Sequence, residues 1–184
     1  MKLKELRKEI VIPEGIEARI EEKTLIVKGA KGENKKTFLY PRILVLIKDN
    51  KVILSALNAT KKDKTMMGTF NAHVKNLIEG VKGGFTYKLK ICSGHFPMTV
   101  SSNKNLVIIS NFMGEKTPRK AKILPDVNFK VEGDIITLTG HDKDKVGQSA
   151  ANIELATRRT GFDKRVFQDG CYIIQKPERE IRLR

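Results

Sequence analysis

The chain has 184 residues, of which 36 are lysine or arginine and 21 are aspartate or glutamate, so that its formal net charge is +15. A positive excess of this size favours polyanionic partners such as nucleic acids. With 40% hydrophobic residues, the composition is that of a globular chain, which excludes disorder over the whole length and places the charge on a folded body.

Membrane insertion and secretion are also disfavoured. The longest apolar runs, 43–47 and 106–109, are far shorter than the roughly 20 residues that a membrane span needs. The N-terminal residues are charged and contain no apolar signal region, so we expect a cytoplasmic protein without a membrane partner. Cys92 and Cys171 are too few for a disulfide scaffold or a four-cysteine zinc site, so we expect both to be reduced and predict no metal or cofactor.

Short β-rich runs separated by glycine or asparagine turns open the chain. We expect strands near residues 9–12, 16–21, 24–28, 35–39, 43–48 and 51–56. A helix is expected over about 61–79, because apolar residues recur there at spacings typical of one helix face. These residues are Met67, Phe70, Val74, Leu77 and Ile78. Thr60 with Asp63 predicts a capping box at the start of this helix, and Gly80 predicts a left-handed C-cap at its end.

The same order of elements follows a second time, after Gly83 and Gly84. We expect strands near residues 85–92, 97–101, 105–110, 117–122, 127–131 and 134–139. A second helix, over about 142–157, would place Val146, Ala150 and Ile153 on its inner face.

A shift of about 81 residues brings the two halves of the sequence into register, for example Lys62-Asp63-Lys64 with Lys143-Asp144-Lys145. Identities are few, but the order of the elements repeats. We therefore predict an α+β fold made of two tandem copies of a small antiparallel sheet packed against one helix. The expected divisions are 1–82 for the first copy, 83–157 for the second copy and 158–184 for a basic C-terminal extension.

Catalytic motifs are weak in this sequence. Cys92 and His95 have a Cys-x-x-His spacing, which could supply half of a metal site or a nucleophile pair, but no second such pair follows. The chain also has no glycine-rich phosphate loop ending in Gly-Lys-Ser/Thr and no Gly-x-Ser-x-Gly elbow. We predict core packing for Cys92 and no enzymatic activity; an RNA-acting enzyme using Cys92, His95 and an acid such as Asp142 is the less favoured alternative.

Two basic segments have the character of RNA-facing loops. Residues 111–122 join two expected strands, with glycine and proline at the bend, and their candidate RNA-binding residues are Lys116, Arg119 and Lys120. The other segment is the C-terminal extension, because six of the ten arginines lie in the last 27 positions. Arginine forks pair with phosphates and stack on bases.

The candidate RNA-binding residues of the extension are Arg158, Arg159, Lys164 and Arg165. They alternate with Phe162, Phe167 and Tyr172, so phosphate pairing and base stacking are both available. The alternative is that Phe167 and Tyr172 pack the extension onto the second sheet while Asp169-Gly170 forms a turn.

A family resemblance becomes apparent in this extension. The segment Arg165-x-Phe167-x-Asp169-Gly170-x-Tyr172-Ile173, at the end of a duplicated chain, resembles the signature of the L-six family of large-ribosomal-subunit proteins in its archaeal and eukaryotic form. The resemblance covers essentially the whole chain, including the opening segment 10–16 and the helix segment 68–81. Cys171 stands where the motif usually has an aliphatic residue.

The resemblance implies a structural, ribosome-bound protein that binds large-subunit rRNA. It implies a place near the stalk base and the sarcin-ricin loop, among neighbouring ribosomal proteins and beside the docking site of translation factors, as a monomer within the ribosome. The second copy and the extension would make the main RNA contacts, with Arg165 as the residue that matches the motif directly. The alternative within RNA binding is a free RNA chaperone, whose binding would be blind to sequence and structure.

Overall fold

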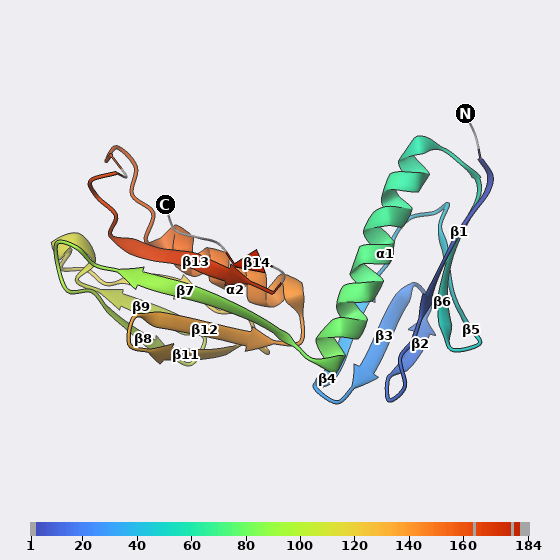
Figure 1. Ribbon diagram of the computed structural model, residues 1–184, viewed down its shortest axis with the longest axis horizontal. Helices are drawn as coiled ribbons and strands as arrows, with labels where there is room; N and C mark the ends of the chain where they lie inside the picture. Colours follow the sequence, from blue (N-terminus) through green and yellow to red (C-terminus); the bar gives the residue numbers. More distant parts are fainter. Residues whose placement is uncertain (1–2, 164, 178, 181–184) are drawn as a thin grey trace. The chain divides into compact units, whose positions relative to one another are not determined.

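The computed structural model describes residues 3–163, 165–177 and 179–180. The chain divides into two compact units, Met1–Gly84 (unit 1) and Phe85–Arg184 (unit 2), each with its own hydrophobic core. Both units combine antiparallel strands with one long helix (Figure 1), so the predicted α+β class is confirmed. In the described part of the chain, neither helix is both long and apolar enough to cross a membrane.

Unit 1 contains, within its described residues, two three-stranded antiparallel sheets and the helix α1 (Lys61–Lys82). One sheet has the order β1-β6-β5, with bounds Leu3–Val11, Lys51–Ala59 and Leu44–Lys48. The other has the order β2-β3-β4, with bounds Glu17–Glu21, Thr24–Gly29 and Gly32–Thr37. The single sheet expected for this copy is therefore divided into two, and α1 contacts strands of both.

The capping box predicted for the first helix is present. The Asp63 carboxylate accepts hydrogen bonds from the backbone N–H of Thr60 (2.8 Å) and from its hydroxyl (2.8 Å), and the Thr60 hydroxyl accepts from the N–H of Asp63 (3.4 Å). The Tyr40 hydroxyl donates to the other oxygen of Asp63 at 2.7 Å. Asp63 is almost completely buried, so its hydrogen bonds tie the segment before β5 to the start of α1.

The C-cap predicted at Gly80 is wrong, because α1 continues to Lys82 and is capped by Gly83. The last turn packs against the hairpin between β3 and β4. The carbonyl of Val81 accepts a hydrogen bond from the N–H of Lys31 at 3.0 Å, and a Cβ atom at Gly29 would lie only 3.0 Å from Val81. The last turn of α1 is thus bonded to a hairpin that is distant in the sequence, and a side chain at position 29 would crowd Val81.

Unit 2 repeats this plan and adds to it. Its described strands form a five-stranded sheet in the order β11-β12-β7-β13-β14 and a three-stranded sheet in the order β10-β9-β8. The bounds of the first sheet are Asn128–Glu132, Ile135–Gly140, Phe85–Cys92, Gly170–Lys176 and Arg179–Glu180. The bounds of the second are Arg119–Lys122, Leu106–Ser110 and Thr99–Asn103, and a short 3-10 segment, η1 (Phe112–Gly114), follows β9.

The helix α2 (Lys143–Ala156) is capped by Asp142, whose side chain accepts hydrogen bonds from the backbone N–H groups of Asp144 and Lys145. Its predicted inner residues Val146, Ala150 and Ile153 are fully buried, and the helix contacts strands of both sheets. The core of unit 2 is therefore built around this helix face.

Part of the C-terminal extension belongs to the five-stranded sheet of unit 2. Strand β13 pairs antiparallel with β7, with Cys171 opposite Ile91 and Tyr172 opposite Lys90 (Figure 1). Cys171 is fully buried and packs in the core of unit 2, and both cysteines are free thiols. Asp169 and Gly170 do not form the expected turn, since Gly170 is the first residue of β13.

Candidate nucleic-acid interface

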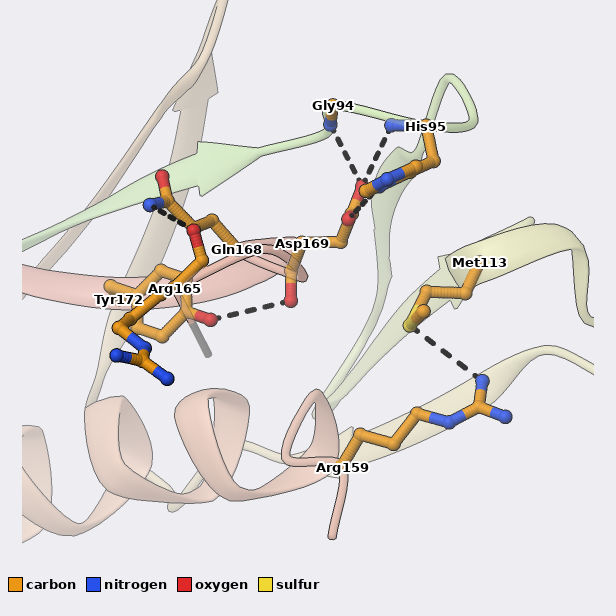
Figure 2. Close-up of polar contacts among 8 residues, drawn as sticks. All are labelled: Gly94, His95, Met113, Arg159, Arg165, Gln168, Asp169 and Tyr172. Carbon is orange, nitrogen blue, oxygen red and sulfur yellow. Dashed lines mark hydrogen bonds and ion pairs between the residues drawn. The ribbon is translucent and has the colours of Figure 1, made fainter. Parts of the chain in front are cut away.

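The segment that joins α2 to β13, residues 157–169, is here called the tail loop. A carboxylate fixes its far end, because Asp169 Oδ1 accepts hydrogen bonds from the backbone N–H groups of Gly94 (2.8 Å) and His95 (3.1 Å), as Figure 2 shows. Asp169 Oδ2 lies 2.6 Å from Nδ1 of the His95 ring. The Asp169 side chain is only 4% exposed. Burial opposes ionisation, but the hydrogen bonds from His95 and Gly94 outweigh it and lower the pKa of Asp169.

Aromatic rings continue this attachment of the tail loop. The ring of Phe167 stacks on His95 with centroids 5.2 Å apart, and Phe162 meets Phe167 edge to face at 5.0 Å. The Tyr172 hydroxyl donates a hydrogen bond to the carbonyl of Asp169 at 3.3 Å. Phe167 therefore packs the tail loop on the loop that follows β7, and the Tyr172 hydroxyl ties Asp169 to the start of β13.

Arg119 ties the tail loop to the neighbouring loop, residues 111–119. Its Nε and Nη2 donate to the two carboxylate oxygens of Glu115 at 2.8 and 2.6 Å, and Nη1 donates to the carbonyls of Ala156 (2.9 Å) and Arg158 (3.2 Å). Its guanidinium also lies 4.2 Å from the centroid of the Phe112 ring. These contacts satisfy carbonyls at the C-terminal end of α2, where backbone acceptors lack helical partners. Most of the hydrogen-bonding capacity of Arg119 is thus directed inward.

Arg159 makes a second link between the same loops. Its Nη1 is 3.6 Å from Sδ of Met113 (Figure 2). Its guanidinium also lies 4.2 Å from the centroid of the Phe162 ring, and Nη1 is 3.9 Å from the carboxylate of Glu115. The hydrogen bonds from Arg119 are the main reason that the pKa of Glu115 is lowered, and the charge of Arg159 adds to the effect. Glu115 is therefore shared by two arginines, and its single negative charge offsets one of their two positive charges.

The remaining candidates face solvent. Lys116, Lys120 and Arg158 are exposed, and the side chain of Arg165 is 89% exposed, paired only at the surface with Asp163 (Nη2 to Oδ2, 2.8 Å). Lys164 lies outside the described residues. The structure thus brings Arg119, Arg158 and Arg159 together with the loop that carries Lys116, and it separates inward-facing arginines from outward-facing cations.

Sequence reasoning missed His95, Asp169 and Glu115 as organisers of this surface. Cys92 and His95 drew attention through their spacing, yet the His95 ring is engaged by Asp169 and Phe167. Burial raises the pKa of the Cys92 thiol, which makes it a poor nucleophile at neutral pH. Among the described residues, no group of three or more metal-ligating side chains comes together.

The pairing of His95 with Asp169 had no local signal, because 74 positions separate them. Glu115 is a single acid in a basic loop, and that isolation is the signal that could have identified it as an internal partner for arginine.

Known proteins resemble both units of this chain. The family model described as Ribosomal protein L6 matches residues 12–84 and 96–170, two segments that fall one in each unit. The large ribosomal subunit protein uL6 of Methanobrevibacter smithii is 48% identical over 171 residues, which cover 93% of this chain and 96% of that protein. The uL6 proteins of Methanosarcina mazei and Methanothrix thermoacetophila are 45% and 42% identical, and each alignment covers 95% of this chain and 99% of the relative. The chain belongs to the ribosomal protein L6 family.

Proposed function

We propose that this protein is a structural constituent of the large ribosomal subunit that binds large-subunit rRNA through the tail loop and residues 111–122 of unit 2. Membership of the family and the names of the archaeal relatives support the ribosomal role, which is structural rather than enzymatic. Neighbouring ribosomal proteins and rRNA are its partners in the cytoplasm. The resemblance to the family further suggests a position near the stalk base, beside the translation-factor docking site.

One observation supports this choice of surface above the others. Glu115 accepts hydrogen bonds from Arg119 and lies 3.9 Å from Arg159, so contacts within unit 2 hold the two loops together. The exposed cations of these two loops, Lys116, Arg158 and Arg165, are therefore presented to solvent by loops that are already held in place. Rigid presentation lowers the ordering cost of binding, and exposed cations suit phosphates.

A matched pair of triple variants tests the proposal. Changing Lys116, Arg158 and Arg165 together to glutamine removes three positive charges from this surface. The control changes Arg19, Lys23 and Lys48 to glutamine, which removes the same charge from exposed positions of unit 1. We expect the first variant to bind an in vitro transcript of large-subunit rRNA at least about 10-fold more weakly than the control, because charge-assisted hydrogen bonds are lost.

The salt dependence of binding provides the second readout. Each neutralised phosphate contributes roughly 0.7 to 0.9 to the slope of log affinity against log salt. The unit 2 variant should therefore show a shallower slope than the control. Equal losses for the two variants would mean that net charge alone matters. Equal affinity of the unaltered protein for unrelated RNAs would favour a free RNA chaperone instead.

A further inference from the structure

A cavity of about 310 Å³ opens beside the end of α2, entirely within unit 2. The tail loop, the start of β13 and the loop after β9 form its walls. Its size is at the lower end of the range for sites that bury a small organic group. The residues that matter for its chemistry are Arg158, Arg159, Phe162, Phe167 and Tyr172.

The walls offer flat surfaces for stacking. Arg159 lies over the face of Phe162 at 4.2 Å from its centroid, and both side chains remain more than one third exposed. An arginine guanidinium that is already stacked on a ring can accept a second flat group on its other side. Unstacked bases of RNA are bound in this manner on aromatic rings and guanidinium planes.

Polar groups complete the cavity. Tyr172 and Glu154 both line the cavity. The Tyr172 hydroxyl donates to the carbonyl of Asp169 and Glu154 Oε1 accepts from the N–H of Ile173, so what these two side chains still offer a ligand is hydrogen-bond acceptors. The amino groups on base edges can donate to such acceptors, which an aliphatic side chain cannot do. Arg158 lines the cavity as an exposed cation, which favours an anionic backbone over a neutral ligand.

The walls are also held in place before any ligand arrives. Asp169 anchors the end of the tail loop to the backbone of Gly94 and His95, and the His95 ring supports Phe167 from behind. Phe167 in turn meets Phe162. A cavity whose walls are fixed by a buried carboxylate needs little ordering on binding.

We propose that this cavity receives one unstacked nucleobase of the bound rRNA, which stacks on the guanidinium of Arg159, on the side opposite Phe162, while its phosphate lies toward Arg158. This inference rests on the proposed function and adds to it a single-nucleotide pocket. The surface cations attract the RNA generally, and the pocket fixes the register of the protein on it.

The absence of tryptophan from the sequence makes the pocket directly observable. Phe162→Trp would introduce one fluorophore into the pocket and keep a stacking surface there. The control is Phe96→Trp, at a ring that is 48% exposed in the same unit and does not line the cavity. On addition of the large-subunit rRNA transcript, we expect strong quenching at position 162 and weaker quenching at position 96, because a stacked base quenches indole emission. Filter binding on the same samples reports affinity independently.

The outcomes separate the pocket from the proposed function. Tight binding without quenching at position 162, or equal quenching at both positions, overturns the pocket and leaves rRNA binding intact. Failure of the unaltered protein to bind the transcript more tightly than unrelated RNA contradicts the proposed function itself.

Truncation of the ring gives a second test. Phe162→Ala removes the ring that supports the Arg159 guanidinium and should weaken binding by roughly 5- to 160-fold, the range for losing one stacked base, whereas Phe96→Ala should not. Chemical probing of the RNA should then show one nucleotide that is protected by the unaltered protein and reactive with the Phe162→Ala variant. Circular dichroism of both alanine variants checks that unit 2 stays folded. Uniform loss of protection over many nucleotides would overturn the single-base pocket.

Discussion

Arg119 and Arg165 carry the same side chain at the same candidate surface, yet their surroundings give them different roles. Arg119 donates to Glu115 and to two carbonyls at the end of α2, whereas Arg165 is almost fully exposed beside Asp163. Residue type alone therefore does not identify an RNA contact. What distinguishes the two arginines is whether their donors are already used inside the protein.

A conservative substitution tests this distinction. Arg119→Lys keeps the positive charge but cannot reproduce a fork that bonds Glu115 and two carbonyls together. We expect it to lower the free energy of unfolding of unit 2 by about 1 to 3 kcal/mol, the cost of leaving such charged hydrogen bonds unmade. Arg165→Lys is the control and should leave stability unchanged, because exposed pairs contribute little. Urea unfolding measures the stability of both variants. If Arg119→Lys were as stable as the unaltered protein, the internal hydrogen bonds of Arg119 would not matter for stability, and Arg119 would again be a candidate for phosphate contact.

Among the elements, the helices show what a single sequence can and cannot predict. The start of α1 was predicted to the residue, because its capping box is a local pattern of Thr60 and Asp63. Its end was not, because the contact of Val81 with the hairpin at Gly29 and Lys31 is tertiary. The strand β13 was missed for the same reason: its alternation is poor, and only pairing with β7 makes it a strand.

The candidate site follows the same rule. Composition identified the cations of the tail loop and of residues 111–122, since charge is visible in the sequence. The contacts between Asp169 and His95 and between Glu115 and Arg159, which help to orient them, join positions distant in the chain. The pair of Glu115 with Arg119 is local, four residues apart. Sequence reasoning therefore found the charged surface and missed the parts that make it rigid.

The ionisation of Asp63 at the start of α1 should make the stability of unit 1 depend on pH. Hydrogen bonds from the Thr60 backbone, from Tyr40 and from the Thr60 hydroxyl lower the pKa of Asp63 to about 2. An aspartate in the unfolded chain titrates near 3.9, so its cap stabilises unit 1 fully above about pH 4 and loses that effect as the pH falls toward 2.

The corresponding variant is Asp63→Asn, which removes the titrating group. We expect it to be less stable than the unaltered protein at neutral pH, with a difference that narrows as the pH falls from about 4 to about 2. Asp49→Asn, at an exposed turn, is the matched control and should show no such convergence. Urea unfolding across this pH range measures the difference; a gap independent of pH would mean that the ionised carboxylate is not what stabilises the cap.

At the scale of the whole molecule, the two units share a plan but differ at one sheet edge. The order β1-β6-β5 of unit 1 corresponds to β7-β12-β11 of unit 2, and only unit 2 adds β13 beyond β7 among the described residues. The added strand brings the tail loop with it. The duplicated fold therefore gains its candidate RNA surface by extending one sheet of one copy.

The last prediction concerns this added strand. Cys171 is fully buried and Ile173 packs on the same core, so removal of β13 exposes the edge of β7 and part of the core of unit 2. A chain ending at residue 169 should lose the dispersed amide signals of unit 2 in NMR spectra, whereas a chain ending at residue 176 should keep them. Unit 1 has its own core and should remain folded in both. If the shorter chain kept a folded unit 2, β13 would not be needed for the core of that unit. The position of the tail loop would then depend on the contacts of Asp169 and of the aromatic rings alone.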